Sequence, residues 1–222
     1  MTALRIESRA ATVPGPVGPL EAVIDTSPGD VTAVAVVCHP HPLQGGTLHN
    51  KVTHTVARAF VRLGAAAVRF NFRGVGQSAG TYDEGRGERA DLAAVAAWCR
   101  DRWPGLPLYL GGFSFGGAVA LAEAAALAPR GLVAVAPAVR RIPPPFTPPA
   151  CPWLVAQGDR DDVVPLAEVR EWLAAVDGGG ELAVLPGAGH FFHGKLPELA
   201  ERVREFLEPL LVAERRGAAG AR

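Results

Sequence analysis

Short apolar runs alternate with longer amphipathic segments along most of the chain. Residues 33–38 form a continuous run rich in valine, which is typical of a strand buried on both faces of a sheet. Comparable short runs recur at residues 66–72, 107–110, 132–136, 153–157 and 181–185. Between them, the segments 50–63, 88–103, 117–127, 165–176 and 197–211 have the periodicity or the composition of helices.

Two further segments, residues 4–9 and 20–24, alternate apolar and polar positions and flank the proline-rich and glycine-rich stretch 14–19. This pattern predicts an antiparallel hairpin at the edge of a sheet. Strands that alternate with helices predict a mostly parallel sheet with helices on both faces. We therefore expect an α/β fold with an eight-stranded sheet, and functional groups beyond the carboxyl ends of its strands.

The composition limits the partners of the protein. The 22 basic and 22 acidic residues balance, which argues against nucleic acid or an anionic membrane surface as a partner. The sequence leaves a homodimer open. A length of 222 residues suits one domain, which we expect over residues 1–213, followed by a disordered tail over 214–222.

The sequence also predicts a cytoplasmic location. Its apolar runs are much shorter than a membrane span, and charged residues interrupt the first nine positions where a signal peptide would be apolar. Its three cysteines, Cys38, Cys99 and Cys151, are odd in number and widely spaced. That arrangement favours reduced thiols over a disulfide framework or a metal site.

The most informative motif is Gly112-Phe-Ser114-Phe-Gly116, which lies between a predicted strand and a predicted helix. A strand that turns sharply into a helix holds its corner residue in a strained conformation, and flanking glycines let neighbouring backbone pass closely. The first N–H groups of the helix would also face a developing negative charge. This pattern predicts Ser114 as a nucleophile, although glycine-rich turns of this kind are common in α/β proteins.

Two later loops supply an acid and a base. Residues 158–165 follow a predicted strand and carry Asp159, Asp161 and Asp162, while residues 186–194 follow the last strand and carry His190 and His193. A serine hydroxyl needs a neutral imidazole to take its proton, and the imidazole needs a carboxylate to fix its tautomer. The chain order serine, aspartate, histidine therefore indicates an α/β-hydrolase.

Three segments, residues 38–47, 50–52 and 69–78, resemble those of small lidless bacterial predicted hydrolases related to the dienelactone-hydrolase-like enzymes. The resemblance implies Ser114 as nucleophile, His190 as general base and Asp161 as the acid, with Asp159 and Asp162 as its competitors. Residues 137–150, where larger relatives insert a helical cap, are too few for one. The resemblance thus implies an open site without a cap domain.

The same resemblance implies an oxyanion hole made by backbone N–H groups of Phe115 and His41. Pro42 has no N–H and is excluded. Because proline follows His39 where other hydrolases have glycine, the register of the second donor within residues 39–46 stays open. The family needs no cofactor and no metal. The expected reaction is hydrolysis of small carboxylic esters, thioesters or lactones through an acyl-enzyme intermediate.

Three alternatives remain at this level. His39 and His41, with His190 and His193, suggest a metal-dependent amidohydrolase, although that class prefers a longer barrel. Residues 74–79 formally match the dinucleotide-binding pattern G-x-G-x-x-A, but later glycines delay the helix that would receive a pyrophosphate. A hydrolase-shaped binding protein without turnover is also compatible with the sequence.

Overall fold

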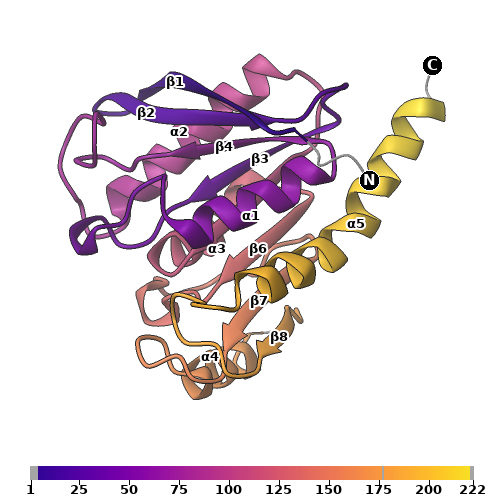
Figure 1. Cartoon of the computed structure of the whole chain (residues 1–222). Helices are drawn as coiled ribbons and strands as arrows, with labels where there is room; N and C mark the ends of the chain where they lie inside the picture. The colour runs from indigo at the N-terminus through magenta and orange to yellow at the C-terminus, as the bar shows by residue number, and fades with distance from the viewer. Residues whose placement is uncertain (1–4, 177, 221–222) are drawn as a thin grey trace.

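A computed structural model of the chain describes residues 5–176 and 178–220. Within these residues, eight strands form one sheet in the order β1-β2-β4-β3-β5-β6-β7-β8 (Figure 1). The strands are β1 (Glu7–Gly15), β2 (Gly18–Thr26), β3 (Ala33–Cys38), β4 (Ala65–Phe70), β5 (Leu108–Phe113), β6 (Gly131–Val135), β7 (Trp153–Gly158) and β8 (Glu181–Leu185).

The sheet is parallel from β4 through β8, and β2 joins it antiparallel to β4. The four central strands β3, β4, β5 and β6 are buried along their whole length, as their apolar runs predict. The mostly parallel eight-stranded sheet predicted from the sequence is therefore confirmed.

Helices cover both faces of the sheet (Figure 1). The helices α1 (Lys51–Arg62) and α5 (Leu196–Gly220) pack on one face, whereas α2 (Arg86–Arg102), α3 (Phe115–Leu127) and α4 (Leu166–Ala174) pack on the other. Each face has its own cluster of buried apolar side chains. Two short 3₁₀ turns, η1 (Pro42–Gln44) and η2 (Val139–Arg141), lie in loops beyond the strand ends.

Two differences from the predicted element boundaries are the largest. The predicted loop 14–19 is largely strand, since the β1–β2 pairing continues through Pro14 with Pro19 and Gly15 with Gly18. Pro14 is tolerated because β1 is an edge strand, where a missing N–H on the open side breaks no ladder. The last helix, predicted to end at Leu211, extends to Gly220, while residues 221 and 222 lie outside the described part.

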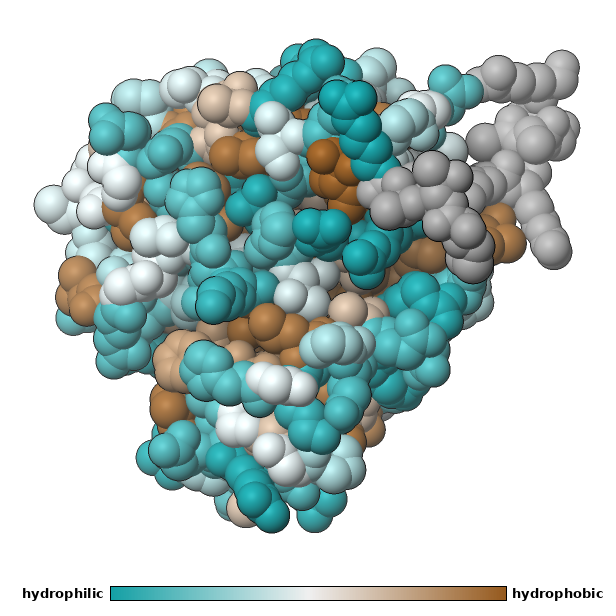
Figure 2. All heavy atoms as spheres, in the orientation of Figure 1, coloured by the Kyte–Doolittle hydropathy of each residue, from teal (hydrophilic) through white to brown (hydrophobic). Residues whose placement is uncertain are grey.

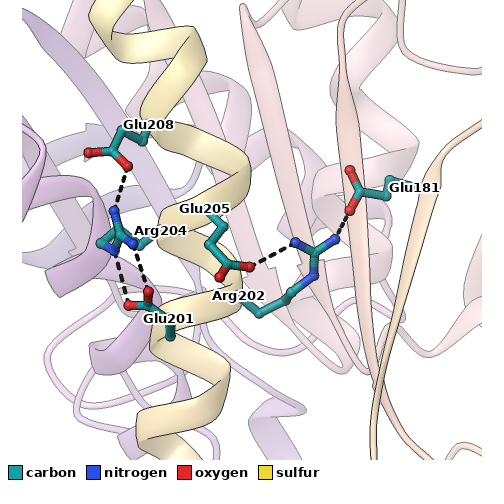
Figure 3. A network of polar contacts seen from close by, with 6 residues as sticks. All are labelled: Glu181, Glu201, Arg202, Arg204, Glu205 and Glu208. Atoms are coloured by element: carbon teal, nitrogen blue, oxygen red, sulfur yellow. Dashed lines mark hydrogen bonds and ion pairs between the residues drawn. The ribbon is translucent and has the colours of Figure 1, made fainter.

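The exposed face of α5 carries ion pairs that suit a solvated helix. Arg204 bonds Glu201 and Glu208, one turn away on either side, and Arg202 bonds Glu205 and reaches Glu181 on β8 (Figure 3). Exposed pairs of this kind add little to stability, because water screens the charges. The charged residues of α5 thus alternate with the buried leucines, so that one face of the helix meets the sheet and the other meets solvent.

The outer surface mixes hydrophilic and hydrophobic residues on the face seen in Figure 2. Among residues 5–176 and 178–220, no helix is long and apolar enough to cross a bilayer. The segment between β6 and β7 contains only η2 and a proline-rich loop. This segment leaves the carboxyl ends of the central strands without a cap domain, as the sequence predicts.

Candidate active site

Ser114 lies at the corner between β5 and α3, with φ 54° and ψ −116°. This region of backbone conformation is rare for a residue with a Cβ and costs on the order of 1–3 kcal/mol. The surrounding structure holds it: Ser114 N–H donates to Val135 O at 2.9 Å, and Ser114 O accepts from Ala138 N–H at 3.1 Å. The strained corner predicted from the motif is therefore present.

The glycines on either side of the corner have no room for a side chain. A Cβ on Gly116 would lie 2.4 Å from His39 O and 2.6 Å from Cys38 O, and one on Gly112 would lie 2.3 Å from Gly116 O. These are backbone atoms that cannot move aside. The end of β3 thus passes directly against the start of α3, which places the loop after β3 beside Ser114.

The imidazole of His190 joins the serine to a carboxylate. His190 Nε2 is 3.0 Å from Ser114 Oγ, and His190 Nδ1 is 2.8 Å from Asp161 Oδ2. Because the carboxylate only accepts hydrogen bonds, Nδ1 carries the proton and Nε2 is left to accept from the serine hydroxyl. All three side chains are nearly buried, and Phe113 packs against the imidazole ring.

Asp161 is the one carboxylate of its loop that points inward. Its Oδ1 accepts the N–H groups of Val163 and Val164 at 2.9 and 2.8 Å. Burial would raise the pKa of Asp161, but the hydrogen bonds from His190 and these N–H groups outweigh it and hold the pKa below its ordinary value. Its two competitors are exposed, and Asp159 instead accepts Gly187 N–H.

Gln157 is a site residue that the sequence analysis missed. It lies on β7, fully buried, and its amide nitrogen donates to Asp161 Oδ2 at 3.0 Å and to Val164 O at 2.8 Å. Its side chain thereby fixes both the carboxylate and the turn that carries it. The available signal was a polar side chain at the end of an otherwise apolar strand, four residues before the acid.

The two predicted oxyanion donors lie beside the serine. Phe115 is the first residue of α3, and His41 lies in the loop after β3 with its ring 5.2 Å from the Phe115 ring. Within the described residues, neither backbone N–H has a hydrogen-bond acceptor. Both residues also line the cleft that contains Ser114.

His39 is buried and holds the loop after β3 by hydrogen bonds from its ring. Its ring is fully buried, with Nδ1 2.6 Å from Pro40 O and Nε2 accepting Phe72 N–H at 3.0 Å. Burial lowers the pKa of His39 to about 4, despite the opposing hydrogen bond to Pro40. Both ring nitrogens are thus used by protein partners, which removes His39 from the predicted metal-ligand pair.

The structure also gives no support to the metal-dependent and dinucleotide-binding alternatives. In the part of the chain that the structure describes, no group of three or more His, Cys, Asp or Glu side chains is arranged to hold a metal ion. His193 is exposed beside Phe191, away from the Ser114 hydroxyl that His190 reaches. Residues 74–79 form a loop, and α2 begins only at Arg86, so no helix N-terminus follows the glycine pattern directly.

The cleft over Ser114 measures about 210 Å³. Its walls combine polar and apolar side chains from the four segments that follow β3, β5, β6 and β7: His41, Gln44, Phe115, Ala138, Val139, Arg140, Arg141, Val163, Val164 and Glu168. Leu43, Val163 and Phe191 on these or adjoining loops are large, exposed apolar side chains, at 71%, 56% and 49% exposure. Of these three, Val163 lines the cleft and offers apolar contact area to a small molecule.

The fold and the comparisons together define an α/β serine hydrolase without a lid. The family model described as serine aminopeptidase, S33 matches residues 30–151, more than half of the chain, and the chain belongs to this family. It is also similar to the uncharacterized protein RP471 of Rickettsia prowazekii (strain Madrid E), with 30% identity over 205 residues, 87% of this chain and 86% of that protein.

Solved structures of α/β hydrolases are similar to this chain along most of its length. XC6422 from Xanthomonas campestris, an α/β serine hydrolase without a lid, is 44% identical with a TM-score of 0.87 and covers 91% of this chain and 94% of its own. An α/β serine hydrolase homologue from Coxiella burnetii is 42% identical, with a TM-score of 0.85 over 89% and 96% of the two chains. Dienelactone hydrolase from Anabaena variabilis, at 19% identity and a TM-score of 0.77 over 91% and 97%, shares the fold. The resemblance drawn from the sequence is confirmed.

Proposed function

We propose that this protein hydrolyses esters of small carboxylic acids, including thioesters and lactones, through an acyl-enzyme formed on Ser114. The observation that carries the proposal is the continuous hydrogen-bonded line from Ser114 Oγ through His190 to Asp161. A hydroxyl next to a neutral, oriented imidazole is the arrangement that acyl transfer requires. The open cleft above it suits a small ester.

In the first half of the reaction, His190 Nε2 takes the Ser114 proton while Oγ attacks the ester carbonyl. The carbonyl oxygen becomes negative, and the N–H groups of Phe115 and His41 stabilise it. Asp161 stabilises the imidazolium through Nδ1. The tetrahedral intermediate then collapses, the bond to the alcohol oxygen breaks, and His190 gives its proton to the departing alcohol.

The second half repeats these steps with water. His190 takes a proton from the water as it attacks the acyl carbonyl, the same donors hold the oxyanion, and the proton passes to Ser114 Oγ as the acid leaves. Because the line of three residues is already hydrogen-bonded, no rearrangement of the protein is needed before either attack.

Charge near the cleft favours esters over aminoacyl substrates. An aminopeptidase needs an anionic group to bind the α-ammonium of its substrate. The carboxylate of Glu168 that lines the cleft is already paired with Arg140 at 2.6 Å, and the neighbouring Arg141 would repel an ammonium. The family description names an aminopeptidase, so aminoacyl p-nitroanilides belong in the test.

The test is a panel of short p-nitrophenyl esters, a thioester, a lactone and aminoacyl p-nitroanilides, run on the wild type and on Ser114→Ala. We expect ester turnover by the wild type, none by the variant, and stoichiometric labelling of Ser114 by a fluorophosphonate. Retained ester turnover in a folded Ser114→Ala protein, or activity lost to a chelator and unaffected by the fluorophosphonate, would overturn the proposal. Binding without turnover across the panel would point to the silent binding protein instead.

A further inference from the structure

Arg141 differs from its neighbour in one respect. Arg140 Nη2 pairs with Glu168 Oε1 at 2.6 Å, whereas Arg141 has no carboxylate partner within the described residues. Its Nη1 donates instead to the Tyr82 hydroxyl at 3.2 Å. Arg141 lines the cleft that contains Ser114, and together with Tyr82 it lines the depression that adjoins this cleft.

The hydroxyl of Tyr82 accepts hydrogen bonds through its oxygen, and its hydrogen remains available to donate. His41 Nδ1 accepts Leu43 N–H at 3.2 Å, so a neutral His41 carries its proton on Nε2, which lies 3.2 Å from the Tyr82 oxygen. That oxygen then accepts from both His41 and Arg141. Its O–H must point elsewhere, and within the described residues it meets no acceptor.

The protonation states support this assignment. Burial, followed by the charge of Arg141, lowers the pKa of His41, which keeps the imidazole neutral near pH 7. Burial raises the pKa of Tyr82, which keeps the hydroxyl protonated. The guanidinium of Arg141 therefore presents donors in the wall of the Ser114 cleft, and the hydroxyl of Tyr82 presents a donor in the adjoining depression.

We propose that Arg141 and Tyr82 form an anion-binding subsite, and that the preferred substrates are esters whose acyl part carries a carboxylate. This inference rests on the proposed esterase function. A planar guanidinium next to a hydroxyl donor suits a carboxylate, which accepts one hydrogen bond from each. The subsite is also in contact with the start of α3, because His41 links Tyr82 to Phe115 through ring packing.

The position of His190 assigns the carboxylate to the acyl part. The leaving alcohol must depart beside His190, which protonates it, and this ring packs against Phe113 and the exposed Phe191. Arg141 belongs to the separate group of Tyr82, His41 and Phe115. The apolar side chains near His190 suit the alcohol, and the donors near His41 suit the far end of the acid.

The test compares p-nitrophenyl half-esters of glutarate and adipate with the same compounds capped by a methyl group on the free carboxylate. Uncatalysed hydrolysis is subtracted for each. We expect the wild type to prefer the charged member of each pair in kcat/KM, and the preference to fall about 10-fold in Arg141→Gln and several-fold in Tyr82→Phe. Arg141→Lys should recover part of it, and high salt should weaken it in the wild type.

Arg62→Gln is the matched control, because it removes the same charge from the exposed last turn of α1, which leads into the start of β4 at the opposite end of the sheet. Glu84 lines the same depression as Arg141, and Glu84→Gln should raise the preference by removing a competing carboxylate. An equal effect of Arg62→Gln and Arg141→Gln, or no effect of Arg141→Gln on an enzyme that hydrolyses the methyl-capped esters, would overturn the subsite alone. Failure to hydrolyse these pairs and the short p-nitrophenyl esters alike would overturn the proposed function, whereas turnover of the short esters alone would overturn the subsite.

Discussion

Gln157 donates its amide N–H to the carboxylate of Asp161 at 3.0 Å and to Val164 O at 2.8 Å, which ties the end of β7 to the turn that carries the acid. The amide oxygen of Gln157 is buried without a hydrogen-bond partner among the described residues. The amide nitrogen makes hydrogen bonds and the amide oxygen makes none, which indicates that the donor is the part of this side chain that the site uses.

Gln157→Met keeps the volume of the side chain and removes its donor. Asp161 then keeps its bonds from Val163 and Val164 but can rotate more freely, so we expect kcat to fall about 10-fold with little change in KM. Stability should fall by about 1–3 kcal/mol, because Val164 O loses its donor. Steady-state kinetics and urea unfolding measure the two effects. Unchanged kcat in a folded variant would contradict the positioning role.

The inward position of Asp161 predicts a clear ranking of the loop carboxylates. Asp161→Asn should lower kcat on the order of 10³- to 10⁴-fold, because an amide can donate to His190 Nδ1 and so favours the wrong tautomer. Asp159→Asn should change kcat only mildly, since its exposed carboxylate bonds Gly187 N–H and not the imidazole. The measurement is kcat/KM for a p-nitrophenyl ester. The reverse ranking would move the role of the acid to Asp159.

The strain at Ser114 predicts a gain in stability when the side chain is removed. Ser114→Gly relieves a positive φ that only glycine adopts without cost, so we expect the free energy of unfolding to rise by about 1–2 kcal/mol while ester hydrolysis is lost. Ser114→Ala keeps the Cβ and is the matched control, with stability close to that of the wild type. Equal stabilities of the glycine and alanine variants would show that the corner stores no strain.

His39 is expected to position the loop after β3 without titrating during catalysis. A glutamine can imitate both of its hydrogen bonds, to Pro40 O and from Phe72 N–H, whereas a leucine can imitate neither. We expect His39→Gln to keep most of kcat and His39→Leu to lose about 10-fold or more, because His41 N–H would move away from the oxyanion. Comparable activity of the two variants would remove the positioning role.

The same residue predicts a pH dependence of stability. The pKa of His39 lies at about 4 in the folded chain, below the ordinary histidine value of 6.5, so below pH 6.5 the unfolded chain binds the proton first. The folded state should lose up to about 3 kcal/mol as the pH falls from 6.5 to 4, and no further contribution should follow at lower pH. Urea unfolding of the wild type and His39→Gln over this pH range isolates the effect, since the glutamine variant lacks it. Parallel curves for the two proteins would contradict it.

The sequence by itself determined the sheet, the corner and the order of the candidate residues. Apolar runs separated by helices require parallel strands, and parallel strands bring their following loops to one edge. Ser114, the acidic loop and His190 were therefore expected at one edge of the sheet. The G-x-S-x-G spacing also fixed the corner, because backbone atoms occupy the space of both missing side chains.

Only the tertiary structure decided which side chains of these loops face inward. Local pattern does not distinguish Asp161 from its neighbours; the choice depends on Gln157 and two backbone N–H groups that receive its carboxylate. Likewise, the sequence presents His39 and His41 as a pair. Packing buries the His39 ring, where it bonds Pro40 O and Phe72 N–H, and places the His41 ring beside Tyr82. Such roles depend on contacts between segments distant in the chain, and those contacts form only when the sheet has brought the loops together.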